Sequence, residues 1–150
     1  MRKILLSMII LFTFSIYSNS QTVQRKFIDK YDSLAITLSN EYKIPPSVIL
    51  GVSMLESGSG TSKLSRNKHN FFGIKSGNYY RGYENDSASF RHFCTIIAKR
   101  KYYSQLVINN VKDYKIWLYK IQSGGYSATK TWANRIIILV KYHKLDKLDI

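Results

Sequence analysis

The sequence contains one cysteine, two prolines and nine acidic residues among 150. A single cysteine cannot form an internal disulfide, so the hydrophobic core alone must stabilise the fold. The low proline content and the absence of low-complexity tracts exclude a collagen-like chain and a proline-rich linker protein. Hydrophobic residues make up 45% of the chain, which is typical of one globular domain at this length.

Acidic residues are outnumbered by 23 lysines and arginines, which gives a formal net charge of +14. Such a charge predicts attraction to a polyanion. If the protein is exported, the polyanions that it meets are wall polymers and phospholipid head groups. The basic residues are spread over every predicted helix and not gathered on one recognition element, so we expect no nucleic-acid partner. A secreted cationic binding protein without enzymatic activity remains an alternative.

A long uncharged hydrophobic run occurs once, at residues 4–16, after Arg2 and Lys3 and before the small residues 18–20. This pattern predicts a secretory signal peptide over residues 1–20, cleaved before Gln21. An N-terminal membrane anchor is the alternative, but a run of about 13 residues is short of the roughly 20 that span a bilayer. We therefore expect residues 21–150 to be an exported monomer, periplasmic or extracellular, without stable membrane insertion.

Hydrophobic periodicity predicts five helices, over residues 24–40, 47–56, 87–100, 113–122 and 131–144. The intervening segment 61–86 lacks a helical period, is rich in Gly, Asn, Ser and aromatic residues, and can supply at most two or three short strands. An irregular segment of this length usually forms a binding or catalytic surface. The predicted fold class is mainly α (α+β), a helical domain with a small irregular or β-containing lobe.

Several reactive or aromatic side chains are expected to serve the core. Cys94 shares a helical face with Phe90, Phe93 and Ile97, which predicts a buried apolar role; a catalytic cysteine paired with His92 is the alternative. Trp117 and Trp132 also lie on apolar helix faces and are predicted to be buried.

The three histidines, His69, His92 and His143, have no metal-ligand spacing, so we predict no metal and no cofactor. His69 is expected to be solvated, with substrate contact as the alternative. The run 99–101 is interpreted as a solvated basic helix end, although with Lys63, Arg66 and Lys68 it could contribute to a wall-binding surface.

Glu56, one of only three glutamates, is the last residue of a predicted helix. It follows Ile49 by seven positions and Val52 by four, so it borders the apolar face of that helix. Partial burial favours the protonated form of a carboxyl group, which is the form that protonates a glycosidic leaving oxygen. A glutamate exposed at the helix end is an equally good interpretation of the periodicity.

Three segments carry a family signature: Ile44-Pro45-Pro46-Ser47-Val48-Ile49-Leu50, Leu55-Glu56-Ser57-Gly58-Ser59-Gly60-Thr61-Ser62-Lys63-Leu64 and Asn70-Phe71-Phe72-Gly73-Ile74-Lys75. Together they resemble glycoside hydrolase family 73, the peptidoglycan-hydrolysing glucosaminidases. The resemblance continues in the family's order and covers roughly residues 30–145. Its later parts are Tyr83, Ser89-Phe90, Gln122-Ser123-Gly124-Gly125-Tyr126 and Trp132-Ala133-Asn134-Arg135-Ile136.

The resemblance implies a lysozyme-like fold and an endo-β-N-acetylglucosaminidase catalytic domain over residues 21–150. Its expected partner is bacterial peptidoglycan, cut after N-acetylglucosamine. Glu56 matches the catalytic acid of the family and Tyr126 the tyrosine that lines its active site. Expected substrate contacts are Asn70, Phe71, Phe72, Gly73 and Tyr83.

The resemblance leaves a second catalytic carboxylate unassigned, because Ser87-Ala88 stands where the family tends to carry acidic residues. In addition, Ala128 takes the usual place of a threonine after the active-site tyrosine. Glu84 and Asp86 are the candidates for the second acid, and Asp86 is equally well interpreted as a helix N-cap. Retaining, inverting and substrate-assisted hydrolysis all remain open, as does a catalytically inactive glycan-binding relative.

Overall fold

The computed structural model describes the backbone of residues 2–149 and the side chains of residues 22–149. Two short strands, β1 (Lys75–Ser76) and β2 (Tyr79–Tyr80), form an antiparallel hairpin in which Lys75 pairs with Tyr80 and Ser76 with Tyr79. The α-helices are α1 (Arg2–Tyr42), α2 (Pro46–Ser57), α3 (Lys63–Lys68), α4 (Asp86–Ala98), α5 (Tyr103–Ile108), α6 (Tyr114–Ile121) and α7 (Trp132–His143). A π-helical turn, η1 (Gln122–Tyr126), follows α6, and a 3-10 turn, η2 (Leu145–Leu148), follows α7.

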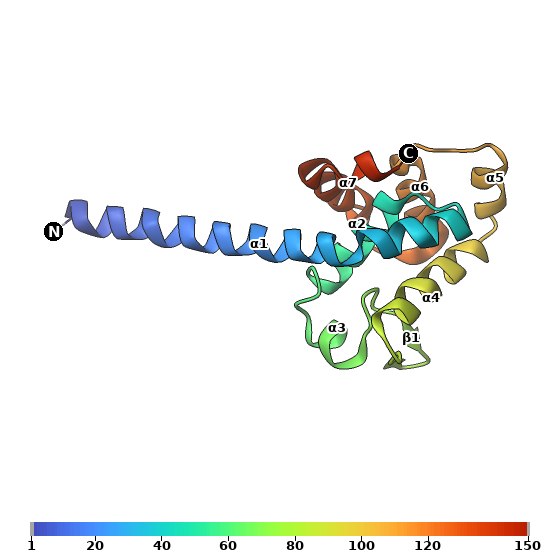
Figure 1. Cartoon of the computed structure of the whole chain (residues 1–150), viewed down its shortest axis with the longest axis horizontal. Helices are drawn as coiled ribbons and strands as arrows, with labels where there is room; N and C mark the ends of the chain where they lie inside the picture. The colour runs from blue at the N-terminus through green and yellow to red at the C-terminus, as the bar shows by residue number, and fades with distance from the viewer. Residues whose placement is uncertain (1, 150) are drawn as a thin grey trace.

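Figure 1 shows α2, α6 and α7 grouped on one side of α1, with α3 and the β-hairpin forming a small lobe on the other side. All five predicted helices are present, and the mainly helical fold class with a small β-containing lobe is confirmed. The structure adds α3 and α5, which have six residues each. Helices this short complete fewer than two turns, so they leave no repeating hydrophobic pattern in the sequence.

Helix α2 lies at the centre of the core, where it packs against α1, α6, α7 and η2. Its residues from Pro46 to Met54 are all buried. Close packing with α7 depends on Gly51, because a Cβ atom there would lie 2.7 Å from Cγ2 of Ile136. The helix that carries Glu56 is therefore held by its neighbours along almost its whole length.

Both ends of α2 are fixed by local chemistry. Pro46 occupies the first turn, and the backbone N–H of Ser47 donates to Oδ1 of Asp149 at 2.9 Å. The Ser47 hydroxyl donates to the other oxygen of the same carboxylate. At the far end Gly58 adopts the left-handed conformation (φ 58°) that closes the helix.

Cys94, Trp117 and Trp132 are buried, as predicted. Burial raises the pKa of the Cys94 thiol to about 12, so this cysteine is not a thiolate nucleophile at neutral pH. The expected apolar role of Cys94 is confirmed.

The predicted signal peptide, residues 1–20, lies outside the residues whose side chains are described. Among the described residues, no helix combines the length and apolar character needed to cross a membrane. Cleavage before Gln21 stays a prediction.

Candidate active site

Glu56 lies in the last turn of α2 and its side chain is exposed. Of the two interpretations of the periodicity, exposure at the helix end is the one observed, because α2 reaches the surface at this turn and opens onto a groove. One carboxylate oxygen is nevertheless fixed: the Trp132 indole donates from Nε1 to Oε1 at 2.7 Å. Trp132 is only 3% exposed, so a buried ring holds the Glu56 carboxylate in position.

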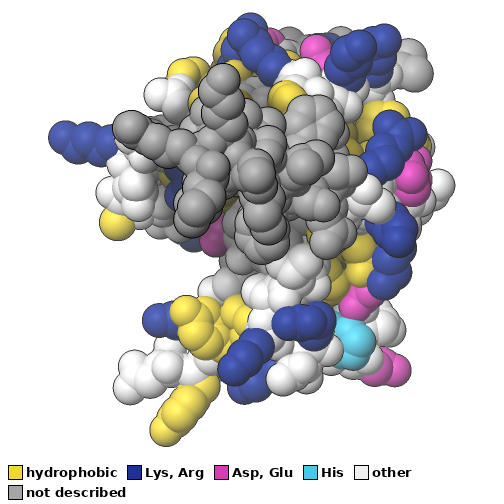
Figure 2. Space-filling view, turned by 90° about the vertical axis from the view of Figure 1, so that its left-hand side faces the viewer, with side chains coloured by type: hydrophobic (Ala, Val, Ile, Leu, Met, Phe, Trp, Pro, Cys, Tyr) yellow, Lys and Arg dark blue, Asp and Glu magenta, His cyan; other side chains and the backbone are white. Residues whose placement is uncertain are grey.

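The groove beside Glu56 has a volume of about 420 Å³. Four parts of the chain form it: the end of α2, the loop 72–74, the last turns of α4 with Arg100, and the segment 125–128. Figure 2 shows the surface hollowed between the helical part of the domain and the small lobe formed by α3 and the β-hairpin. The lining residues are Glu56, Phe72, Gly73, Ile74, Ile96, Arg100, Gly125, Tyr126, Ser127 and Ala128.

The loop 72–74 passes directly beside the carboxylate. Gly73 has φ +63°, and a Cβ atom there would lie 3.8 Å from Oε2 of Glu56. Asn70 organises this loop from inside: its Nδ2 donates to the carbonyls of Ile74 and Arg81, both at 2.8 Å, and its Oδ1 accepts from the Ile74 N–H at 3.0 Å. Since Asn70 is 1% exposed, its contacts are with the loop backbone.

The two phenylalanines of this segment are also buried, at 4% for Phe71 and 3% for Phe72. Phe71 packs on Tyr31 and Phe90, while Phe72 stacks on Phe93 with ring centroids 4.4 Å apart. Phe72 still lines the groove, whereas Phe71 does not.

Tyr126 reaches the groove from the end of η1. Its hydroxyl donates to the carbonyl of Phe72 at 3.1 Å, and its ring lies between Trp132 and Phe93 at 5.3 and 5.7 Å. Burial of the hydroxyl, with the nearby Glu56 carboxylate, raises the pKa of Tyr126 well above its usual value. The phenol therefore remains a neutral hydrogen-bond donor at neutral pH.

The glycines before Tyr126 set its position. Gly125 has φ +84°, and a Cβ atom on Gly124 would lie 2.4 Å from Cε1 of Tyr102. Any larger residue at position 124 would displace the Tyr102 ring, which explains the Gly-Gly pair.

Tyr83, predicted to contact substrate, is half-buried and outside the groove lining. Its hydroxyl is hydrogen-bonded to Nδ1 of His92 at 2.7 Å. Burial raises the pKa of Tyr83; burial, aided by Arg81 and Lys99, lowers the pKa of His92. Both groups are therefore neutral at neutral pH. Their hydrogen bond joins the loop between β2 and α4 to α4 itself.

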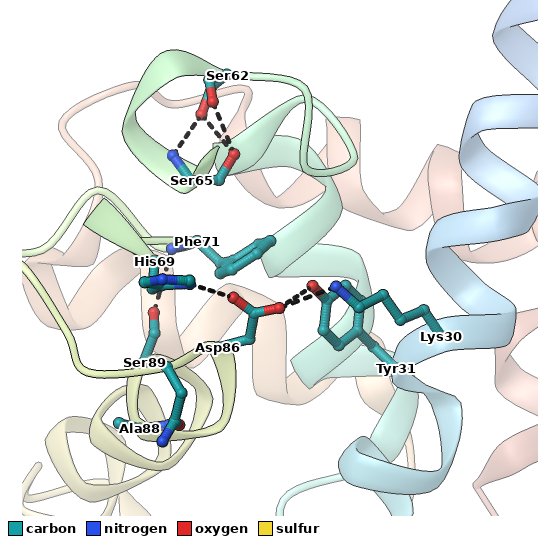
Figure 3. A network of polar contacts seen from close by, with 10 residues as sticks. Lys30, Tyr31, Ser62, Ser65, His69, Phe71, Asp86, Ala88 and Ser89 are labelled. Atoms are coloured by element: carbon teal, nitrogen blue, oxygen red, sulfur yellow. Dashed lines mark hydrogen bonds and ion pairs between the residues drawn. The ribbon is translucent and has the colours of Figure 1, made fainter. Parts of the chain in front are cut away.

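Asp86 has a structural network of its own, shown in Figure 3. It accepts from the Tyr31 hydroxyl at 2.6 Å and from Lys30 Nζ at 3.0 Å, and it pairs with Nδ1 of His69 at 2.6 Å. Burial would raise the pKa of Asp86, but these three hydrogen bonds outweigh it and hold the pKa below its ordinary value. His69, predicted to be solvated, is half-exposed and is also held by Asp86.

The N-cap interpretation of Asp86 is wrong. Asn85 caps α4, because its side chain accepts from the Ala88 N–H at 2.9 Å, and Asp86 is the first helical residue. Asp86 lines a second groove that shares no lining residue with the groove at Glu56. The structure thus does not bring Asp86 to the candidate acid.

Glu84 is exposed on the loop before α4. It makes no hydrogen bond or ion pair with any residue from 22 to 149, and it does not line the groove at Glu56. Within the same range, no three His, Cys, Asp or Glu side chains gather closely enough to hold a metal ion.

Comparison with known proteins places these features in a family. Residues 32–145 match the glucosaminidase model described as mannosyl-glycoprotein endo-beta-N-acetylglucosaminidase. The chain belongs to this glucosaminidase family. It is 31% identical over 153 residues to the exo-glucosaminidase LytG of Bacillus subtilis (strain 168), an alignment that covers 84% of this chain and 54% of LytG. The chain thus spans about half the length of that relative.

Two solved structures share the fold of this glucosaminidase-family domain. The catalytic domain of the autolysin Auto from Listeria monocytogenes has a TM-score of 0.74 at 23% identity, over 85% of this chain and 88% of the other. A peptidoglycan hydrolase from Sphingomonas sp. A1 has a TM-score of 0.68 at 18% identity, over 82% and 91%. The predicted lysozyme-like fold is confirmed.

Two residues have roles at this site beyond those that the sequence predicts, Trp132 beneath Glu56 and Arg100 in the groove lining. Trp132 was predicted only as a core residue, although it also holds Glu56. Arg100 belongs to the basic run interpreted as a solvated helix end or as part of a wall-binding surface, and it lines the groove. The family signature includes Trp132 and is the available signal for it, whereas the basic run 99–101 indicates a surface role for Arg100 without placing it beside Glu56.

Proposed function

We propose that this protein hydrolyses the β-1,4 bond after N-acetylglucosamine in peptidoglycan glycan strands, with Glu56 as the general acid. The observation that carries the proposal is the Glu56 carboxylate, which lines the groove of a glucosaminidase-family domain with Oε1 held by Trp132. Because Oε1 accepts the indole N–H, the proton of the acid form belongs on Oε2. That oxygen lies toward Gly73 and is the one from which a leaving oxygen can be protonated.

A glycan strand lying in the groove would exclude water from the Glu56 carboxyl group and from the scissile bond. Tyr126 offers an aromatic face for a sugar ring, and its hydroxyl oxygen, whose proton is donated to Phe72, can accept from the N–H of an acetamido group. Asn70, Phe71 and Tyr83 act in this proposal by shaping the loops around the groove, while Phe72 and Gly73 form its wall.

The groove supports substrate-assisted hydrolysis best. Among the described residues, its lining contains no carboxylate other than Glu56. The 2-acetamido group of the substrate can then attack the anomeric carbon as Glu56 protonates the leaving oxygen. Water opens the cyclised intermediate in the second step, with Glu56 now acting as the base.

We also infer that the protein acts outside the cytoplasm at the bacterial wall, as a monomer. The support is the predicted signal peptide and the net charge of +14, which complements the carboxylates of peptidoglycan.

Digestion of purified peptidoglycan tests the proposal. Products are reduced with borohydride and identified by mass: reduced N-acetylglucosamine ends are expected, whereas reduced muramic ends indicate a muramidase and anhydro ends a lytic transglycosylase. The length distribution of the products distinguishes endo from exo cleavage. Wild-type release of muramic or anhydro ends alone would overturn the assignment.

The Glu56→Gln variant tests the role of the acid. Loss of a general acid costs about 10²–10⁴ in rate, so we expect at least a hundredfold fall in turnover with an unchanged circular dichroism spectrum. Glu41→Gln is the matched control, because Glu41 pairs with Arg91 at an exposed site away from the groove. A folded Glu56→Gln variant with wild-type turnover would contradict the proposal.

A further inference from the structure

The groove at Glu56 is lined by two charged side chains of opposite sign, Glu56 and Arg100. They form no ion pair with each other, since their charged atoms are not within 4.0 Å. The Arg100 side chain makes no hydrogen bond or ion pair with any residue from 22 to 149. A cation without a protein partner therefore lies in the groove at a distance from the acid.

The backbone fixes where this guanidinium starts. Arg100 follows α4, and its N–H donates to the Ile97 carbonyl at 3.0 Å. Ile96, one helical turn earlier, lines the same groove. The positive charge of Arg100 also acts to lower the pKa of Tyr102, against the rise caused by burial. The ring of Tyr102 packs against Gly124. Arg100 thus lies near the segment that carries Tyr126 into the groove.

The chemistry of the substrate places an acidic group in this region. This step rests on the proposed function, in which cleavage after N-acetylglucosamine leaves a muramic sugar on the leaving side. Its O4 is the leaving oxygen that Glu56 protonates. The 3-O-lactyl group of that sugar is attached to the neighbouring carbon, so it must enter the groove close to Glu56.

We propose that Arg100 is a specificity-determining residue that binds the lactyl carboxylate of the muramic sugar on the leaving side of the scissile bond. A guanidinium binds a carboxylate through two parallel hydrogen bonds, and these charge-assisted bonds are stronger than one to a neutral carbonyl. The lactyl group is a free carboxylate in strands stripped of their stem peptides and an amide in intact strands. The enzyme therefore prefers stripped strands.

Matched substrates test this preference. Glycan strands are freed of stem peptides by an amidase, and half of the material has its lactyl carboxylates converted to neutral methylamides. At fixed ionic strength, we expect the wild-type protein to show about fivefold higher kcat/KM on the carboxylate strands. In Arg100→Gln this ratio falls to about one because the change acts on the carboxylate strands alone, and Arg100→Lys, which keeps the charge without the planar fork, gives an intermediate ratio.

Lys101→Gln is the control, since it removes one positive charge one residue away from the groove lining. It is expected to keep the wild-type ratio. Equal slowing of Arg100→Gln on both substrates would overturn the proposal, because it would indicate a structural or general catalytic role. A wild-type ratio of one would also overturn it.

These outcomes are separable from failure of the proposed function. Reduced N-acetylglucosamine ends in the Arg100→Gln digests keep that function in place whichever way the ratio moves. Hydrolysis of none of the strands would remove the function and this inference together.

Discussion

The indole N–H of Trp132 donates to Oε1 of Glu56 across 76 positions of sequence, at 2.7 Å. Trp132 is the first residue of α7, and its ring also contacts that of Tyr126. One buried side chain thus positions both the candidate acid and the tyrosine beside it.

Replacing Trp132 with Phe removes this hydrogen bond while keeping an aromatic ring. We expect turnover to fall by at least about tenfold, because a hydrogen bond to a charged group contributes roughly 1.5–3 kcal/mol. Trp117→Phe is the matched control, since Trp117 donates from Nε1 to the Val111 carbonyl at 2.8 Å away from the groove. Both variants should lose stability in urea unfolding, but only Trp132→Phe should lose activity. Equal activities of the two variants would mean that the indole does not position Glu56.

Tyr126→Phe deletes the hydroxyl that donates to the Phe72 carbonyl. We expect lower turnover with a loss of about 0.5–1.5 kcal/mol in the free energy of unfolding. Tyr103→Phe deletes an equivalent hydroxyl, which donates to the Tyr42 carbonyl at 2.6 Å, and serves as the control. Thermal melts and turnover are measured on the same preparations. A large fall in melting temperature with normal turnover would assign Tyr126 a packing role only.

The contrast between Trp132 and Asp86 indicates what the sequence could predict. Periodicity placed Trp132 in the core correctly, because burial follows from a repeating pattern within one helix. It could not predict which distant group the indole contacts, since α2 and α7 meet only through tertiary packing. The same limit applies to Asp86, whose partners Lys30 and Tyr31 come from α1, 56 and 55 positions away.

The Asp86 network predicts a pH dependence of stability. The pKa of Asp86 is lower in the folded state, so the network stabilises the protein above the unfolded pKa of about 4. This contribution is lost as the pH falls through the folded pKa. Asp86→Asn should therefore reduce the free energy of unfolding by about 1–3 kcal/mol at pH 6, with the difference from wild type shrinking toward pH 2.

Urea unfolding of both proteins at pH 6, 4, 3 and 2 measures this difference. Asp29→Asn provides the control, because Asp29 pairs with Arg25 at an exposed surface site and should change stability by less than about 0.5 kcal/mol. A difference between Asp86→Asn and wild type that persists unchanged to pH 2 would contradict the network's role.

Substrate assistance predicts that neither Glu84, before α4, nor Asp86, at its start, is needed for chemistry. Glu84→Gln, Asp86→Asn and the double variant should keep turnover within about threefold of wild type at neutral pH, where a catalytic carboxylate would cost about 10²–10⁴. A thiazoline analogue of the cyclised acetamide should inhibit. A hundredfold loss confined to Glu84→Gln would instead identify Glu84 as the second carboxylate, brought in by its loop.

The Asp149 carboxylate ties the first turn of α2 to the residue that follows η2. Ser47 and Asp149 are 102 positions apart, so α2 receives this acceptor only when nearly the whole domain is present and η2 has packed against it. Closing a loop of this length costs conformational entropy, which the packing of η2 against α2 must offset. The helix that carries Glu56 at one end is thus anchored at its other end by the residue that follows η2, so the position of the candidate acid depends on the integrity of the domain as far as Asp149.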